Sequence, residues 1–372
     1  MIICLDLRFK TESGASSYIK NLVPHLLKQD KENEYIFVKY PDQKFEFELG
    51  KRKIILSPSS NAIIQLLWDV TILPLKLRDL GVTLYHPLKN PGLIWGNFKK
   101  VFTIHSINVD YKGSFPTSFR RHLYHTIYTN YFTKKCTRLI AVSEFLSNFA
   151  AEGLRINKKY IDVIYHGIDP KFKKLNDDQI AHTLKKYNLP KDYILSVGNI
   201  TPVKNHLTTV KAFGLISESI KEKYVIVGAT SDPYCQVVSD FIKKNNLTER
   251  VFLPGFIQSD DLPSLMSGAK LLLFPSLTEG CPVTMLEAFA CGLPVVASKR
   301  GGLWDLGKDC AEFVDNPDDD KTFAEKIVYL LQSTEARSAL SQKSLAVAED
   351  FSWENCAHEH LKTYQKCAPC VR

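Results

Sequence analysis

The chain has 372 residues, of which 45% are hydrophobic and 24% are charged, and its formal net charge is +8. This composition excludes an intrinsically disordered chain, and the length exceeds what one hydrophobic core needs and is sufficient for two. The nine cysteines are odd in number and follow no disulfide framework, which indicates a reducing compartment and predicts a cytoplasmic protein.

The N-terminus predicts a first strand over residues 1–6 and no secretory signal, because no basic segment precedes its short apolar run. The best candidate for a membrane span lies at residues 61–77, where Asp69 and Pro74 interrupt the apolar sequence. A spanning helix needs about 18 or more clean apolar residues, so we expect this segment to stay outside the bilayer core.

Basic residues occur partly in pairs, at 99–100, 120–121, 134–135, 173–174 and 185–186. No helix-turn-helix, zinc finger or aromatic RNA platform accompanies them, so the sequence indicates no nucleic-acid partner. Two interpretations stay open for these pairs: scattered solvated side chains, or a peripheral contact with an anionic membrane surface.

Short apolar runs alternate with helical patterns along the chain, which is typical of parallel α/β sheets. The first round of expected strands, after residues 1–6, comprises 35–39, 82–85, 101–104, 138–142 and 161–165. The second round comprises 193–198, 224–228, 251–254, 270–275, 294–297 and 312–314. The polar stretch 171–178 is the clearest linker. We therefore expect two doubly wound, Rossmann-like domains facing a cleft, with ligands at the carboxyl ends of their strands.

Three loops at expected strand ends carry candidate site residues. Gly14 opens a helix after the first strand, so its backbone can approach a phosphate, although Gly and Ser before a helix are also ordinary caps. His105 ends the strand 101–104, where catalytic residues gather, although a strand-end His is often structural. Asn199 and Lys204 lie between a strand and a helix, from where the Lys204 ammonium can reach a diphosphate; an isolated Lys is more often solvated.

The most informative segment spans residues 276–296 and contains two carboxylates. Glu279 lies in the loop after a buried strand, and Glu287 lies inside a short helix expected over 284–291. Free N–H groups at the start of that helix favour an anion or sugar hydroxyls beside Glu279. Apolar residues flank Glu287, so its carboxylate needs a partner. Alternatively, Glu279 complements the helix dipole and Glu287 faces solvent.

This segment resembles the signature of the retaining glycosyltransferases of family 4, which have the GT-B fold. The shared pattern is Glu-Gly, a second Glu eight residues after the first within Leu-Glu-Ala, and then Ala-Cys-Gly-x-Pro-Val-Val. The resemblance implies that Glu279 approaches the hydroxyls of the donor sugar and that Glu287 holds the ribose hydroxyls. Cys281 and Val283 would supply backbone N–H groups to the sugar, because Pro282 between them has none.

The same resemblance covers nearly the whole chain and assigns further roles. Lys204, the Gly14 loop and the helix that starts near Thr284 would receive the leaving diphosphate, and His105 would touch the transferred sugar. Phe256 follows the strand 251–254 in the loop that would hold the nucleotide base, although it fits a core position equally well.

The chain departs from the family pattern at three places. Ser16 and Ser17 stand where further Gly and Arg are usual, Ser106 stands where Asp commonly follows the His, and Asn199 replaces a frequent Arg. The departure at Asn199 leaves Lys204 as the principal cation for the donor phosphates.

The last helix resembles the crossover helix with which this family returns to its first domain. The resemblance therefore implies discontinuous domains. Residues 1–170 with 351–372 would form the acceptor-binding domain, and residues 171–350 would form the donor-binding domain.

Two patterns could suggest a metal site. Residues 318–320 form an Asp-x-Asp, but they follow Asn-Pro and predict a turn that caps the helix 321–331. Cys356, His360, Cys367 and Cys370 have ligand-like spacings near the C-terminus, where structural zinc sites are unusual. We expect no metal and no cofactor other than the donor substrate.

These observations favour a metal-independent enzyme that transfers a hexose with retention, from a GDP- or UDP-sugar to a glycan or polyprenyl-linked acceptor. The sequence is nearest to mannosyltransferase-like members that build surface polysaccharides. Such an enzyme would be cytoplasmic, with a peripheral contact at the inner face of the membrane. The alternatives are a GT-B-fold epimerase acting on a UDP-sugar and a non-catalytic nucleotide-sugar-binding scaffold, which the departures at Ser17, Ser106 and Asn199 favour.

Overall fold

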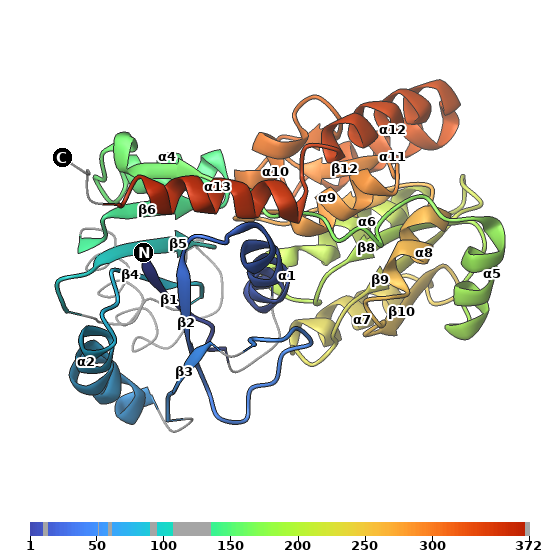
Figure 1. Cartoon of the computed structure of the whole chain (residues 1–372). Coiled ribbons are helices and arrows are strands. Elements are labelled where there is room, and N and C mark those ends of the chain that lie inside the picture. Colours follow the sequence, from blue (N-terminus) through green and yellow to red (C-terminus); the bar gives the residue numbers. More distant parts are fainter. Residues whose placement is uncertain (10–13, 51, 59–61, 90–94, 107–134, 369–372) are drawn as a thin grey trace. The chain divides into compact units, whose positions relative to one another are not determined.

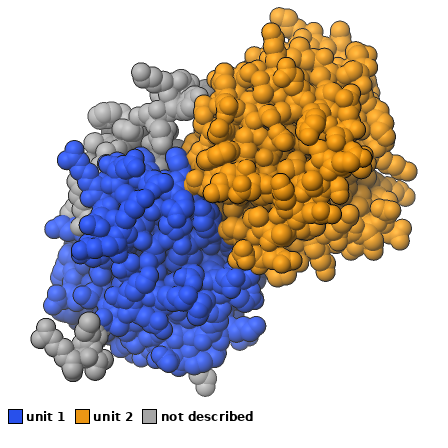
Figure 2. Space-filling model, turned by 90° about the horizontal axis from the view of Figure 1, so that it is seen from above, with its two compact units in different colours: residues 1–167, 352–372 blue, residues 168–351 orange. Residues whose placement is uncertain are grey.

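A computed structural model describes residues 1–9, 14–50, 52–58, 62–89, 95–106 and 135–368. The chain divides into two compact units, coloured separately in Figure 2. Unit 1 comprises residues 1–167 and 352–372, and unit 2 comprises residues 168–351. The last helix of the chain therefore belongs to the unit that contains the first strand.

Unit 1 is built on a seven-stranded sheet in the order β3-β2-β1-β4-β5-β6-β7, in which every pairing is parallel. Its elements in chain order are β1 (Ile2–Asp6), α1 (Gly14–Gln29), β2 (Glu34–Lys39), β3 (Lys53–Leu56), α2 (Ala62–Asp79), β4 (Leu84–Pro87), β5 (Lys99–Ile104), β6 (Arg138–Ala141), α4 (Glu144–Glu152), the 3₁₀ turn η1 (Lys158–Tyr160), β7 (Ile161–Val163) and α13 (Trp353–Gln365).

Unit 2 is built on a six-stranded parallel sheet in the order β10-β9-β8-β11-β12-β13. Its elements are α5 (Asp177–Lys186), β8 (Tyr193–Val197), the 3₁₀ turn η2 (Pro202–Lys204), α6 (His206–Ile216), β9 (Lys223–Val227), α7 (Tyr234–Lys244), β10 (Val251–Gly255), α8 (Leu262–Gly268), β11 (Leu272–Phe274), α9 (Val283–Ala290), β12 (Val295–Ser298), α10 (Gly301–Gly307), β13 (Glu312–Val314), α11 (Asp320–Gln332) and α12 (Thr334–Ala348).

Both units are doubly wound α/β domains, so the expected fold class is confirmed. The central strands β1, β8 and β12 are buried nearly throughout, as parallel strands covered on both faces should be. Helix α13 packs beside α1 (Figure 1). Trp353 and Tyr364 of α13 join Tyr18 and Leu22 of α1 in one core. This contact attaches the C-terminal segment to unit 1.

The strand predictions differ from the structure in several places within unit 1. Strand β5 begins two residues before the expected start and β7 ends two residues before the expected end. The differences at β3 and β4 have a clear physical cause. No strand was expected at β3, whose four residues lie at the sheet edge and are mostly exposed, so they lack the long apolar run of a central strand. The strand expected at 82–85 begins two residues later, because Val82 donates its N–H to Leu77 O at 2.9 Å in the turn that closes α2.

Residues 62–77 of the interrupted apolar segment form most of α2, and no helix among the described residues is long and apolar enough to cross a membrane. Asp69 of this helix is buried and accepts a bond from Arg8 Nη1 at 2.7 Å. Arg8 also donates through Nε to Asp6 at 2.8 Å, and Tyr85 donates to Asp6 at 2.7 Å. This buried cluster attaches α2 to the carboxyl end of β1.

Burial raises the pKa of Asp69 to about 6, and the Arg8 guanidinium opposes that shift. Arg8→Met should therefore be strongly destabilising, because it leaves two buried carboxylates without their cation. We expect a loss of about 3–5 kcal/mol in the free energy of unfolding, measured by urea denaturation. Arg78→Met is the matched control, since Arg78 pairs with Asp79 on the surface and should change stability by about 1 kcal/mol or less. Equal losses in both variants would contradict the role of Arg8.

Candidate functional site

The strand order of unit 2 reverses direction between β8 and β11. In open parallel sheets, the loops that leave the carboxyl ends of two such strands diverge, and ligands bind in the crevice between them. The loop after β8 carries Lys204, and the loop after β11 carries Glu279. The topology therefore places both predicted site residues at the switch point of this sheet.

Lys204 and Glu279 form an ion pair in which Lys204 Nζ lies 2.5 Å from Glu279 Oε1. Both side chains are largely buried, with 26% of Lys204 and 15% of Glu279 exposed. The two loops are joined directly, because Leu277 donates its N–H to Val203 O at 2.8 Å. The ion pair thus lies in a partly dehydrated setting where charge interactions are stronger than in water.

The Glu279 loop is fixed by the start of α10. Gly302 donates its N–H to Glu279 O at 3.0 Å, and a Cβ at Gly302 would lie 2.3 Å from Gly280 O. Only glycine fits so close an approach of two backbones. The position of the Glu279 carboxylate is therefore set by backbone contacts on both sides of its loop.

The start of α9 differs from the expected donor arrangement. Val283 donates its N–H to Cys281 O at 2.9 Å, so this group is already engaged. The prediction that Val283 offers its N–H to the sugar does not agree with this turn. The Thr284 N–H has no bonding partner among the described residues, as is usual in the first turn of a helix. Thr284 is consequently the better candidate for an anion contact.

Glu287 is partly buried in α9. Its backbone O accepts a bond from Cys291 N at 3.2 Å, but its carboxyl group forms no hydrogen bond or ion pair with any residue that the structure describes. Burial raises its pKa to about 8; Lys171 opposes the shift and Asp169 adds to it. The interpretation of Glu287 as a solvated surface residue is thus wrong. The partner that the sequence required is not provided by the described part of the protein, which leaves the carboxyl group available to a ligand.

Two more predicted residues lie at the same edge of this sheet. Asn199 accepts a bond from Ala229 N at 3.2 Å, and a Cβ at Gly228 would lie 2.0 Å from Gly198 O, so the loops after β8 and β9 touch. Phe256 follows β10 and is 69% exposed. Its assignment to a hydrophobic core is therefore wrong, and its ring is free to meet a planar ligand.

His206 lies at the start of α6, two residues after Lys204, and was not identified from the sequence. It is buried, and burial lowers its pKa to about 4, with Lys204 adding to the effect. At neutral pH this imidazole is uncharged, so Lys204 carries the positive charge of this loop. Its position directly after Lys204 and Asn205 is the feature of the sequence that could have identified His206.

In unit 1, Gly14 starts α1, and a Cβ there would meet no atom within 4 Å. His105 follows β5 and bonds Leu88 O through Nε2 at 2.7 Å. Because a carbonyl only accepts, Nε2 carries the proton, and the buried Nδ1 is an acceptor without a partner among the described residues. Burial lowers the pKa of His105 to about 4, so it is neutral at pH 7.

His105 belongs to a buried ring cluster that the sequence did not reveal. Its ring meets the edge of Tyr18 at 4.7 Å between centroids, and His166 stacks on the same Tyr18 at 4.9 Å. The Tyr18 hydroxyl lies 2.5 Å from His360 Nε2. Helix α13 therefore helps to orient the residues around His105.

The metal-like patterns have structural roles in the described residues. Asp319 is the N-cap of α11 and accepts a bond from Thr322 N at 3.0 Å, which confirms the predicted cap. His360 is buried, and its Nδ1 bonds Cys356 O at 2.7 Å within α13. Cys370 lies outside the described residues. Within the described ranges, no three His, Cys, Asp or Glu side chains are grouped to hold a metal.

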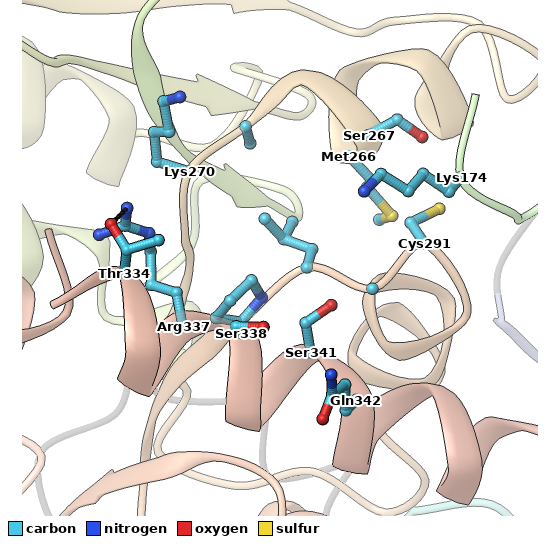
Figure 3. A pocket seen from close by; sticks show the side chains of 14 residues that line it. Lys174, Met266, Ser267, Lys270, Cys291, Thr334, Arg337, Ser338, Ser341 and Gln342 are labelled. Atoms are coloured by element: carbon cyan, nitrogen blue, oxygen red, sulfur yellow. Dashed lines mark hydrogen bonds between the residues drawn. The ribbon is translucent and has the colours of Figure 1, made fainter. Parts of the chain in front are cut away.

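A separate pocket of about 320 Å³ opens in unit 2 near residues that precede β11 and β12. Figure 3 shows Lys270 and Arg337 at one end of it and Lys174 with Cys291 at the other. The Arg337 guanidinium is engaged, since it donates to Leu331 O at 2.7 Å. Because Lys270 and Pro294 precede their strands, this hollow lies at the opposite edge of the sheet from Glu279.

Two family models match the chain in succession. Glycosyltransferase Family 4 matches residues 13–172, and Glycosyl transferases group 1 matches residues 179–346. These matches cover both units and contain all the site residues discussed above. The chain belongs to the glycosyltransferase family that these two models describe.

Individual relatives support this assignment. O-antigen chain mannosyltransferase B of Escherichia coli is 29% identical over 184 residues, which cover 49% of this chain and 48% of the relative. The chain thus matches about half the length of that protein. An uncharacterized glycosyltransferase of Methanocaldococcus jannaschii is 25% identical over 95% of this chain and 94% of its own length.

Solved structures agree in fold. A glycosyltransferase from Rickettsia africae superposes with a TM-score of 0.77 at 19% identity, covering 98% of both chains. HepE of Anabaena, determined in complex with UDP and glucose, has a TM-score of 0.75 at 18% identity and covers 98% of this chain and 99% of its own. At this identity the likeness shows the fold alone, and that fold is GT-B.

The raised pKa of Glu287 predicts a pH-dependent stability. The folded pKa lies above the ordinary value of 4.5, so the folded state binds more protons than the unfolded state between about pH 4.5 and 8. Stability contributed by this group is complete below that window and falls as pH rises through it. Glu287→Gln should raise the melting temperature at pH 8 and leave it nearly unchanged at pH 4. Glu325→Gln, at an exposed position of α11, is the control. If both variants change the melting temperature equally at pH 8, the idea that Glu287 is dehydrated is contradicted.

Proposed function

We propose that this protein transfers a hexose-type sugar from a nucleotide-sugar donor to a glycan or lipid-linked acceptor, with retention at the anomeric carbon. The observation that carries the proposal is the pairing of Lys204 with Glu279 at the switch point of unit 2. A cation and a carboxylate there match the two ends of a sugar diphosphate.

Departure of the nucleoside diphosphate concentrates negative charge on its oxygens, so stabilising that charge is the main task of the site. In the proposed mechanism Lys204 binds the donor phosphates, and the Thr284 N–H at the start of α9 adds a fixed donor. Glu279, released from Lys204, holds the hydroxyls of the transferred sugar and faces the positive charge that develops at the anomeric carbon. The acceptor attacks from the face that the diphosphate leaves, and the leaving phosphate takes its proton.

We assign Glu287 and Phe256 to the nucleotide part of the donor. The partly buried carboxyl group of Glu287, which has no bonding partner among the described residues, can bond the two ribose hydroxyls. The exposed ring of Phe256 lies in the loop proposed to hold the base. The family resemblance assigns sugar contact to His105 and diphosphate contact to Gly14. The unpartnered acceptor Nδ1 of His105 is suited to a sugar hydroxyl.

We propose a GDP- or UDP-sugar as donor and a role in surface polysaccharide synthesis, because several relatives are named as O-antigen or serotype-specific mannosyltransferases. Charge stabilisation by Lys204 and backbone N–H groups replaces the metal ion that other sugar transferases use, so the proposed reaction needs no metal. A polyprenyl-linked acceptor would bring the enzyme to the inner face of a membrane as a peripheral protein.

Glu279→Gln and Lys204→Ala should each lower turnover by at least about 10², the scale of losing one preorganised electrostatic contact. Turnover is measured in the presence of EDTA as release of nucleoside diphosphate with donor and acceptor. Glu325→Gln and Lys244→Ala, both on exposed helix surfaces of unit 2, are the matched controls and should retain wild-type rates. Unchanged rates in either site variant, with folding verified by circular dichroism, would contradict the site.

Substitutions of Glu279 and Glu287 should differ in which ligand they affect. A charge-assisted bond to ribose is worth roughly 1.5–3 kcal/mol. Glu287→Ala should therefore weaken the binding of both the free nucleoside diphosphate and the intact donor by that amount. Glu279→Ala should weaken binding of the intact donor far more than binding of the diphosphate, because the Glu279 carboxylate is assigned to the sugar. Titration calorimetry of both variants with both ligands measures this. The reverse pattern would exchange the two assignments.

Two alternative functions can be distinguished from sugar transfer by experiment. An epimerase would convert a UDP-sugar to its epimer without any acceptor, and a binding scaffold would leave the donor unchanged. Incubating the donor with and without a lipid-linked glycan, followed by analysis of the sugar products, separates them from a transferase. The family membership favours transfer.

A further inference from the structure

Helix α2 of unit 1 has apolar side chains on two opposite faces. One face is buried, where Trp68, Leu73 and Leu77 pack against the sheet. A helix that is apolar all round is normally covered all round. On the other face of α2, four apolar side chains are 40–70% exposed.

The exposed face carries a stripe of mostly apolar side chains. Ile63, Leu67 and Leu75 lie in one row at multiples of four residues along the helix. The polar Thr71 lies between Leu67 and Leu75, and Ile72 lies at the edge of the row. Their exposed fractions are 70%, 56%, 40% and 44% in the order Ile63, Leu67, Leu75 and Ile72. Isolated exposed apolar residues need no explanation, but a stripe of this length does.

The stripe has apolar neighbours on other segments. Trp95 is 50% exposed and donates its indole N–H to Val70 O in α2 at 2.6 Å. Ile54 and Leu56 are exposed on the edge strand β3, which lies near α2 in Figure 1. A groove of about 600 Å³ lies between β3 and the end of α2. We call the six side chains Ile54, Leu56, Ile63, Leu67, Ile72 and Leu75 the α2–β3 surface.

The charges at this groove are mainly positive. Lys53 and Lys76 line it and form no ion pair with any residue in the described ranges. Its one lining acid, Asp79, is already neutralised by Arg78 at 3.1 Å. A second copy of this chain would bring the same lysines opposite one another, which disfavours self-association. A negatively charged partner is favoured instead.

We propose that the α2–β3 surface docks on an anionic lipid bilayer, with its apolar side chains in the interface and Lys53 and Lys76 against the headgroups. A tryptophan whose N–H is satisfied, an apolar stripe and adjacent lysines are the composition that interfacial helices use. This inference gives a location to the membrane contact proposed above. Its test does not require sugar transfer, so the two proposals can fail separately.

Co-sedimentation of the full chain with vesicles tests the docking. The wild type should bind vesicles of equal phosphatidylglycerol and phosphatidylcholine, bind pure phosphatidylcholine weakly, and lose binding in 1 M NaCl. Lys53→Gln/Lys76→Gln should lower the partition coefficient about 25-fold, from about fivefold for each basic residue. Leu67→Gln/Leu75→Gln should lower it at least about tenfold, because two apolar side chains no longer enter the interface.

Matched controls lie in unit 2. Lys243→Gln/Lys244→Gln removes two exposed lysines of α7, and Leu215→Gln changes a leucine that is 61% exposed in α6; both should bind vesicles as the wild type does. All variants should keep wild-type melting temperatures and nucleoside diphosphate affinity. Absence of wild-type binding, or unchanged binding of Leu67→Gln/Leu75→Gln, would overturn the proposal. A concentration-dependent dimer that this variant dissociates, without vesicle binding, would assign the surface to a second copy and also overturn it.

Discussion

The site depends on the ion pair between Lys204 and Glu279, which spans the point where the strand order of unit 2 reverses. Two opposite charges in a partly buried crevice stabilise one another while no ligand is bound. The proposed sugar diphosphate donor would offer phosphate oxygens to Lys204 and hydroxyl donors to Glu279, so each member of the pair would gain a new partner when the other is released. The crevice is thus prepared for a charged ligand without leaving a bare charge in its absence.

Glu287 has the same functional group as Glu279 in a different environment. It has no counter-ion within bonding distance, and burial favours its protonated form up to about pH 8. The carboxyl group of Glu287 has already lost part of its hydration in the folded protein, so it gives up less water when hydroxyl groups bind it, and those hydroxyl donors would favour its charged form. The difference between the two carboxylates follows from their neighbours: Glu279 leaves a loop beside a lysine, and Glu287 leaves the middle of an apolar helix.

Much of this arrangement could be predicted from the sequence because it is local. The strand-loop-helix around Glu279 and the cap at Asp319 follow from short-range patterns of apolar residues, Gly, Pro and Asp. The Tyr18 and His360 contact joins residues 342 positions apart, and no local pattern encodes it. The turn at Val283 also escaped prediction, since the sequence shows that Pro282 lacks an N–H but not where the neighbouring N–H points.

Helix α2 shows that the direction of one charged side chain matters as much as its presence in an apolar segment. In the sequence, Asp69 interrupts an apolar run and argues against a membrane segment. In the structure this carboxylate turns inward to Arg8, so the charge lies on the buried side and the apolar stripe lies on the exposed side. An inward ion pair attaches the helix to the sheet while its outer face remains free to meet a lipid surface. The residue that rules out a spanning helix is therefore the one that makes an interfacial helix possible in this fold.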